Sequence, residues 1–173
     1  DVLNPEIVRA GEEAIAACDV YMSQLENPMD AIMEGLRLAK KHGRTVVLDP
    51  APARPLPDEI FALCDYLTPN ETELEIITGM PVDTVEQAIT AARTLIAKGA
   101  KAVINKRGAA GSLLITADDA RMFPGFTVRA VDTTAAGDSF NAGFSIGIAR
   151  GYAIEDAIKL GNAVGALSTT KSG

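Results

Sequence analysis

The stretch VDTTAAGDSFNAGF, residues 131–144, joins a run of small residues to the start of an apolar helix. Ala135, Ala136 and Gly137 would let a ligand approach their backbone closely, with N–H groups at the positive end of the helix dipole. Phosphoryl transfer requires such donors where negative charge develops. Asp138 follows on the first turn, where its carboxylate is placed to accept a proton from an attacking hydroxyl. The plainer alternative is that the aspartates of this stretch only cap a helix.

Outward from this stretch, short apolar runs typical of strands alternate with segments of helical periodicity. We predict helices over residues 5–17, 28–42, 57–64, 71–78, 84–98, 136–150 and 154–170. We predict strands over 19–25, 45–48, 66–68 and 102–105, followed by an antiparallel set at 112–116, 120–123 and 127–129. This alternation predicts an α/β fold with a doubly wound, mostly parallel sheet flanked by helices, in a single domain over residues 1–173.

The composition is that of an ordinary soluble globular protein, with 173 residues, 47% hydrophobic and 23% charged. The net charge of -7 argues against nucleic acid or an anionic membrane as a partner, because both require basic patches. Cys18 and Cys64 lack metal-ligand spacing, and no stretch is apolar over enough residues to cross a bilayer. The first residues, DVLNPEIVRAG, lack the layout of a signal peptide. We therefore expect a cytoplasmic protein.

The stretch 131–144 matches the DTxGAGD signature of the ribokinase-like (PfkB) carbohydrate kinases, and the chain is most similar to the ribokinases among them. Ala135 stands where many members carry Gly. The resemblance implies the ribokinase-like fold and an anion hole at residues 135–137 for the transferred phosphoryl group. It also implies that Asp138 is the catalytic base, in contact with the substrate hydroxyl.

A second motif, TPNETE at residues 68–73, resembles the NxxE motif of that family. The resemblance implies that Asn70 lies beside ATP and that Glu73 organises Mg²⁺ through water. A capping box, in which Asn70 caps a helix and Glu73 reaches back to it, is an alternative that is compatible with this role.

A third segment, NKRGAAG at residues 105–111, resembles the strand-to-loop segment that lies along the nucleotide in the family. It implies ATP contacts from Lys106, Gly108, Ala109 and Gly111, since glycines let the backbone reach phosphate or ribose. Lys106 stands where ribokinases usually have Thr and related sugar kinases have Lys, so a direct contact with phosphate is expected. The alternative is a plain strand–turn–strand.

Three further segments match the family in order along the chain. QLENP, residues 24–28, resembles the strand end whose Glu lies near sugar and nucleotide, so Glu26 is expected to face the cleft; the alternative is a solvated turn carboxylate. DPAPARP, residues 49–55, is expected to be a structural loop beside the cleft. Asn162 occupies the helix position that borders the adenine.

A monovalent cation site, usually for K⁺, is also implied by the resemblance. Asp132, the carbonyl of Thr134 and the region 168–173, which includes Thr169, match the loops that hold this ion. The cation would orient the anion-hole loop and would not touch the substrate.

The resemblance implies ATP-dependent phosphorylation of a primary hydroxyl on a small sugar, with ribose, giving ribose 5-phosphate, as the first candidate. Lys106 leaves kinases for fructose, 2-keto-3-deoxygluconate or a nucleoside as alternatives, and a non-catalytic nucleotide-binding module is the alternative of another class. The family's N-terminal part, with its Gly-Gly sugar motif and lid, has no counterpart in the sequence. We therefore expect the 173 residues alone to phosphorylate sugar poorly or not at all, and a homodimer only through the lid.

Overall fold

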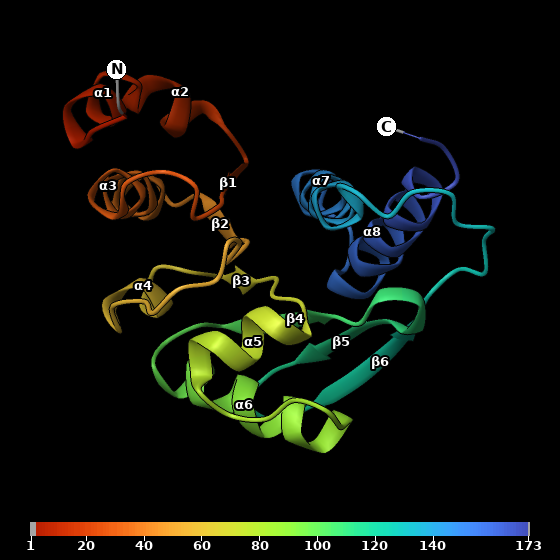
Figure 1. Cartoon of the computed structure of the whole chain (residues 1–173). Helices are drawn as coiled ribbons and strands as arrows, with labels where there is room; N and C mark the ends of the chain where they lie inside the picture. The colour runs from red at the N-terminus through yellow and green to blue at the C-terminus, as the bar shows by residue number, and fades with distance from the viewer. Residues whose placement is uncertain (1–2, 173) are drawn as a thin grey trace.

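The structure is a computed structural model that describes residues 3–172 and is built around one six-stranded sheet (Figure 1). The strands are β1 (Val20–Ser23), β2 (Thr45–Leu48), β3 (Tyr66–Leu67), β4 (Ala102–Lys106), β5 (Gly111–Ile115) and β6 (Ala120–Pro124). The helices are α1 (Pro5–Ala10), α2 (Glu12–Ala17), α3 (Met29–Lys41), α4 (Glu59–Ala62), α5 (Glu71–Thr78), α6 (Val85–Ala97), the 3₁₀ turn η1 (Gly108–Ala110), α7 (Ala136–Ala149) and α8 (Ile154–Ser168). None of these helices is long and apolar enough to span a bilayer.

The strands lie side by side in chain order, β1-β2-β3-β4-β5-β6. The pairings of β1 with β2, β2 with β3 and β3 with β4 are parallel, and those of β4 with β5 and β5 with β6 are antiparallel. Helices connect the parallel strands, as crossover connections require. The predicted α/β fold, a mostly parallel sheet flanked by helices, is confirmed.

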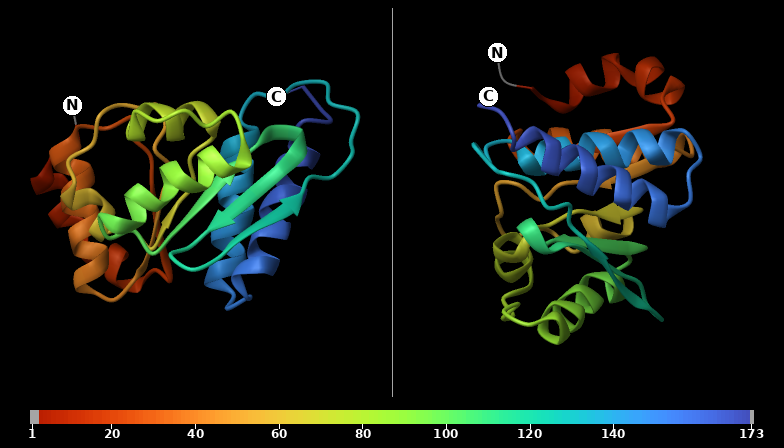
Figure 2. Two further views of the ribbon diagram at one scale, coloured as in Figure 1. Left: turned by 90° about the horizontal axis from the view of Figure 1, so that it is seen from below. Right: turned by 90° about the vertical axis from the view of Figure 1, so that its right-hand side faces the viewer.

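Helices cover both faces of the sheet because successive side chains of each strand point to opposite faces. Val46 and Leu48 of β2 belong to a core shared with α3, α4, α5 and α6. Val47 belongs to a second core shared with α7 and α8. Figure 2 shows α7 and α8 on one side of the sheet and α5 and α6 on the other.

The two helices α7 and α8 pack closely because glycines line their contact. A Cβ at Gly147 would lie 2.8 Å from the Cα of Ala157, and one at Gly143 would lie 3.0 Å from Val164 Cγ2. Phe144 of α7 is fully buried, with its ring edge-on to that of Tyr66 in β3 at a centroid distance of 5.2 Å. The start of α7 is therefore held at a fixed place beside the sheet.

Two predicted elements differ from the structure. The helix predicted over 5–17 is two helices, because Gly11 ends α1 with its N–H bonded to Val8 O, and glycine is a weak helix former. The strand predicted over 127–129 is wrong: these residues pair with no described strand. Thr127 and Val128 line a cavity instead.

Candidate active site

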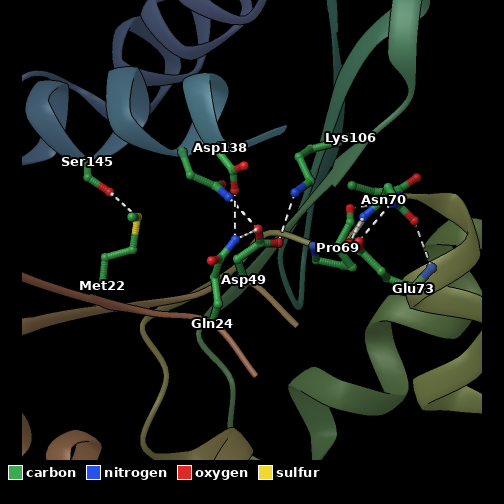
Figure 3. A network of polar contacts seen from close by, with 11 residues as sticks. Met22, Gln24, Asp49, Pro69, Asn70, Glu73, Lys106, Asp138 and Ser145 are labelled. Atoms are coloured by element: carbon green, nitrogen blue, oxygen red, sulfur yellow. Dashed lines mark hydrogen bonds and ion pairs between the residues drawn. The ribbon is translucent and has the colours of Figure 1, made fainter. Parts of the chain in front are cut away.

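Polar residues gather where the parallel strands end. Gln24 follows β1, Asp49 follows β2, Asn70 follows β3, and Lys106 is the last residue of β4. The carboxyl ends of parallel strands meet at one edge of a sheet, which is where ligands bind in open α/β folds. Figure 3 shows these four side chains at that edge, with Gln24, Asp49 and Lys106 beside Asp138 of α7 and Asn70 beside Glu73.

The first turn of α7 has the backbone expected of an anion site. Ala135 is left-handed, with φ 57° and ψ 15°, and the helix begins at the next residue. Ala136 donates its N–H to Thr133 O at 3.2 Å, so one predicted donor of the anion hole is already used. Within residues 3–172, the N–H groups of Gly137 and Asp138 donate to no acceptor. They are left for an anion at the positive end of the helix.

The carboxylate of Asp138 is exposed and is tied to the sheet edge by one residue. Gln24 donates from Nε2 to Asp138 Oδ1 at 2.7 Å and to Asp49 Oδ2 at 3.3 Å. Figure 3 shows the amide of Gln24 between the two acids. Oδ2 of Asp138 accepts from no donor within residues 3–172, and Asp138 lines a cavity, so this oxygen is available as a proton acceptor.

Asp49 is a buried charge, with a relative exposure of 2%. Its Oδ1 accepts from Lys106 Nζ at 2.9 Å, and its Oδ2 accepts from Asn141 Nδ2 at 2.7 Å. Asn141 lies on α7, one turn after Asp138. A buried carboxylate is stable only when it is paired and hydrogen-bonded, and here it has both kinds of partner.

The ammonium of Lys106 lies against the start of α7. A Cβ placed on Gly137 would be 3.3 Å from Lys106 Nζ, so a residue without a side chain permits this approach. The side chain of Lys106 is only 13% exposed. A positive charge therefore stands beside the two free N–H groups, where a phosphoryl group would gather negative charge.

The capping box predicted at Asn70 is present. Asn70 Oδ1 accepts from Glu73 N at 2.8 Å, and Glu73 Oε2 accepts from Asn70 N at 2.7 Å. Glu73 Oε1 accepts from Asn70 Nδ2 at 2.8 Å. Each carboxylate oxygen of Glu73 keeps lone-pair capacity for a water molecule on Mg²⁺, so capping and the predicted role are compatible.

The charge of Glu73 is sensitive to its surroundings. Burial raises the pKa of Glu73, while the Asn70 N–H and the Lys106 ammonium lower it. The carboxylates of Asp49 and Asp138 raise the pKa again. No group of three or more His, Cys, Asp or Glu side chains suited to a metal ion occurs in the part of the chain that the structure describes. The role of Glu73 in organising Mg²⁺ stays a prediction.

Two cavities meet at the start of α7. The first, of about 380 Å³, is mainly apolar, with Phe126, Val128, Phe140 and Ala166 among its walls. The second, of about 360 Å³, is lined by four acids, Asp49, Glu71, Glu73 and Asp138. Both are lined by Lys106, Gly108, Thr133, Ala136 and Gly137. The first cavity, an apolar chamber, and the second, a polar chamber, thus share a wall that contains Lys106 and the start of α7.

The predicted nucleotide loop lies along the apolar chamber, whose lining includes Gly108, Ala109 and Gly111. Gly111 has φ 99°, and a Cβ there would lie 2.1 Å from Phe123 O, so only glycine fits. Asn162 also lines the chamber, but its side chain is occupied: Oδ1 accepts from Ser112 Oγ at 3.0 Å, and Nδ2 donates to Phe123 O at 3.3 Å. Asn162 therefore fastens α8 to the sheet, and its place beside adenine stays a prediction.

The residues of the predicted cation loop lie together. Asp132 Oδ1 accepts from Thr134 N at 2.8 Å, and the carbonyl of Thr169 accepts from Val131 N at 2.7 Å and Asp132 N at 3.1 Å. The loop before the anion hole is thus bonded to the end of α8. Gly173, at the end of the predicted region, lies outside the described residues. The K⁺ site stays a prediction.

The structure does not bring Glu26 into this group. Glu26 is exposed in the turn after β1 and lines neither cavity. Gln24, two residues earlier, makes the contact with Asp138 instead. The sequence reading missed Gln24, Asp49 and Asn141 as site residues. For Asp49, a polar residue directly after the buried strand TVVL was the available sign.

The sequence and the structure both have clear relatives. A family model described as pfkB family carbohydrate kinase matches residues 10–173. The chain is 42% identical over 171 residues to a ribokinase of Haemophilus influenzae, covering 99% of this chain and 56% of that protein. It is 40% identical over 172 residues to a deoxyribokinase of Salmonella typhimurium, with the same coverage of 99% and 56%.

Among solved structures, the ribokinase of Arabidopsis thaliana complexed with ribose and ATP superposes with a TM-score of 0.91 at 31% identity. That match covers 95% of this chain and 54% of the other. The ribokinase of Thermotoga maritima gives a TM-score of 0.87 at 37% identity, covering 99% and 56%. The chain therefore spans about half the length of the relatives it matches.

Proposed function

Because this chain belongs to the pfkB family of carbohydrate kinases, we propose that it is the nucleotide-binding, base-bearing part of a sugar kinase. The reaction is transfer of a phosphoryl group from ATP to a primary hydroxyl of a small sugar, with ribose first and ribose 5-phosphate as product. The observation that carries this proposal is the position of Asp138. Its carboxylate stands at the start of α7, beside free N–H groups and in the wall of the second cavity, next to Gly137, which lines both cavities.

The residues supply three parts of the transfer. The carboxylate of Asp138 accepts the proton of the attacking hydroxyl, an assistance worth roughly 10²–10⁴-fold. The N–H groups of Gly137 and Asp138, together with Lys106, stabilise the charge that develops on the transferred group. ATP supplies the phosphoryl group, and Mg²⁺, organised by Glu73 through water, neutralises charge on its phosphates.

The sugar is assigned from the named relatives. Ribokinases and a deoxyribokinase are about equally similar to this chain, and the solved structure of the Arabidopsis enzyme holds ribose and ATP. Fructose, 2-keto-3-deoxygluconate and nucleosides stay as alternatives because Lys106 stands where ribokinases usually have Thr and related sugar kinases have Lys. A panel of these compounds, tested with the full-length enzyme for ADP formation, identifies the acceptor. Fastest turnover of a compound other than ribose would contradict the ribose assignment.

Replacing Asp138 by Asn tests the catalytic role. We expect ADP formation to fall by roughly 10²-fold or more while ATP still binds. Asp156→Asn is a matched control, because Asp156 also lies in the first turn of a helix, α8, away from both cavities. Turnover retained in Asp138→Asn would contradict this role. No ADP formation by the parent enzyme with any sugar of the panel would favour the alternative of a module that only binds nucleotide.

The remaining parts of the proposal concern the whole protein. The matched segment is 56% of the length of the Haemophilus influenzae relative, so we expect the 173 residues alone to bind ATP but to phosphorylate sugar poorly or not at all. Sugar-dependent ADP release by the 173 residues at the full rate would overturn this expectation. Cytoplasmic location, K⁺ dependence and a homodimer through a lid are retained as predictions.

A further inference from the structure

Asp49 has a place in the site that the proposed function does not by itself require. Its carboxylate is 2% exposed and accepts from three donors on three elements: Lys106 at the end of β4, Asn141 on α7, and Gln24 after β1. It is therefore the common acceptor of these three donors, and Figure 3 shows it between Gln24 and Lys106. A carboxylate this deeply buried is retained at a cost, so its partners indicate its use.

The first arm of the network leads from Asp49 to the wall that the two cavities share, which contains Lys106 and Gly137. Asp49 Oδ1 lies 2.9 Å from Lys106 Nζ, which in turn lies 3.3 Å from the Cβ position of Gly137. A lysine side chain has many rotamers and loses them only when its ammonium is held. The ion pair with Asp49 keeps this ammonium beside the free N–H groups of α7.

The second arm leads to the base. Asp49 Oδ2 accepts from Asn141 at 2.7 Å and from Gln24 at 3.3 Å, and Gln24 donates to Asp138 at 2.7 Å. An amide nitrogen has two hydrogens, and both of those on Gln24 are directed at carboxylates. Because an ionised carboxylate only accepts, Asp49 fixes which way the amide of Gln24 points, and so which oxygen of Asp138 is occupied.

We propose that Asp49 is a positioning residue that holds the ammonium of Lys106 and, through Gln24, the carboxylate of Asp138 in one arrangement for phosphoryl transfer. The proposal rests on the proposed function. It predicts that loss of Asp49 lowers kcat but does not lower the affinity for ATP. The negative charge of Asp49 repels the phosphates of ATP, so its removal should not weaken ATP binding even though it disturbs the transfer geometry.

The test compares turnover with ATP affinity in the full-length enzyme. In Asp49→Asn, we expect kcat to fall by about 10–100-fold while the Kd for ATP, from isothermal titration, stays equal or becomes smaller. In Lys106→Met, the Kd for ATP should rise by about tenfold or more, because a charged donor to phosphate is lost. Gln24→Met should lower kcat with an unchanged Kd, and it provides a test that leaves no buried charge unpaired.

Asp65→Asn is the matched control. Asp65 is likewise a buried aspartate held by lysines, Lys40 and Lys101, but it precedes β3 and so lies at the opposite edge of the sheet. This variant should lose stability and keep the kcat of its folded fraction. A fall of kcat in Asp49→Asn together with a weaker Kd for ATP, or a kcat within twofold of the parent in both Asp49→Asn and Gln24→Met, would overturn the proposal.

The proposed function and the positioning role fail in different ways. If the parent enzyme forms no ADP with any sugar of the panel, the proposed function fails. The positioning role is then still judged by ATP binding. It is supported if only Lys106→Met weakens the binding, and it is refuted if Asp49→Asn weakens it to the same extent.

Discussion

Replacing Gly161 by Ala should distort the apolar chamber from behind. Gly161 lies in α8 against Phe140 of α7, and a Cβ there would lie 2.9 Å from both Cδ2 and Cε2 of that ring and 3.0 Å from its carbonyl oxygen. The ring of Phe140 is a wall of the chamber and stacks on Phe144 at 6.2 Å. The added methyl group must therefore push the ring toward the chamber or move the two helices apart.

Two opposing effects set the magnitude. Alanine is better than glycine in a helix interior by about 1 kcal/mol. Overpacking of a filled site costs about 1–3 kcal/mol. The net effect of Gly161→Ala is a loss of roughly 0–2 kcal/mol in the free energy of unfolding, with a middle value near 1. For a domain of this size, 1 kcal/mol corresponds to about 2–4 °C in Tm.

The assay pairs thermal unfolding, followed by circular dichroism, with titration of ATP. Gly161→Ala should lower Tm by the amount above and weaken ATP binding, since Phe140 lies on the chamber wall. Gly11→Ala is the control: its φ is -92°, and the nearest atom to the new Cβ is Val8 O at 3.4 Å. That substitution should stabilise by about 0.4–1 kcal/mol and leave ATP binding unchanged. A Tm for Gly161→Ala at or above that of Gly11→Ala would refute the packing argument.

Ala135→Gly should raise the free energy of unfolding, measured in urea, by about 0.5–1 kcal/mol. The left-handed backbone at residue 135 strains alanine, and relief of this strain outweighs the extra entropy that glycine gives the unfolded chain. A loss of stability would contradict this prediction. Burial alone would raise the pKa of Asp65, but hydrogen bonds from Lys101, the Val46 N–H and Lys40 outweigh it and lower that pKa. The stability due to Asp65 is therefore present above about pH 3.9 and lost as the pH falls through the lowered value, so acid unfolding should be steeper in the parent than in Asp65→Asn. Burial raises the pKa of Glu73, so the stability that Glu73 contributes is lost as the pH rises above about 4.5. Glu73→Gln keeps the capping box and should therefore stabilise the fold at neutral pH, while it weakens Mg²⁺-dependent ATP binding. An unchanged Tm would contradict this prediction.

Local patterns predicted the fold well where a segment carries its own boundaries. The strand at 45–48 and the helix at 71–78 have the predicted bounds, because TVVL is bounded by polar residues and Asn70 with Glu73 forms a cap within the segment. The run at 127–129 has strand-like residues, but it does not pair with β6, the edge strand that precedes it, or with any other described strand. A strand requires a partner, and the sequence of one segment does not contain that partner.

The candidate site divides in the same way. The small residues before α7 and the carboxylate of Asp138 are adjacent in sequence, so their joint use was predictable. Asp49 and Lys106 are 57 residues apart, and their ion pair depends on β2 and β4 ending at the same edge. Gln24 and Glu26 both belong to the motif QLENP. Which of them faces α7 depends on how the chain turns after β1, and the motif alone does not determine that turn.

The packing of α7 and α8 bears on the order in which the protein is made. Val47, Ile104 and Leu114 form an apolar sheet face that these two helices cover in the described chain, yet all the strands precede them in sequence. As the chain leaves the ribosome, this face is complete before its cover exists, and exposed apolar surface invites aggregation. A chain stopped at residue 135 should accordingly bind a dye specific for apolar surface and require a chaperone, whereas the 173-residue chain should not. Asp138 lies on α7, so the newly made chain acquires this carboxylate and covers its apolar face in a single event.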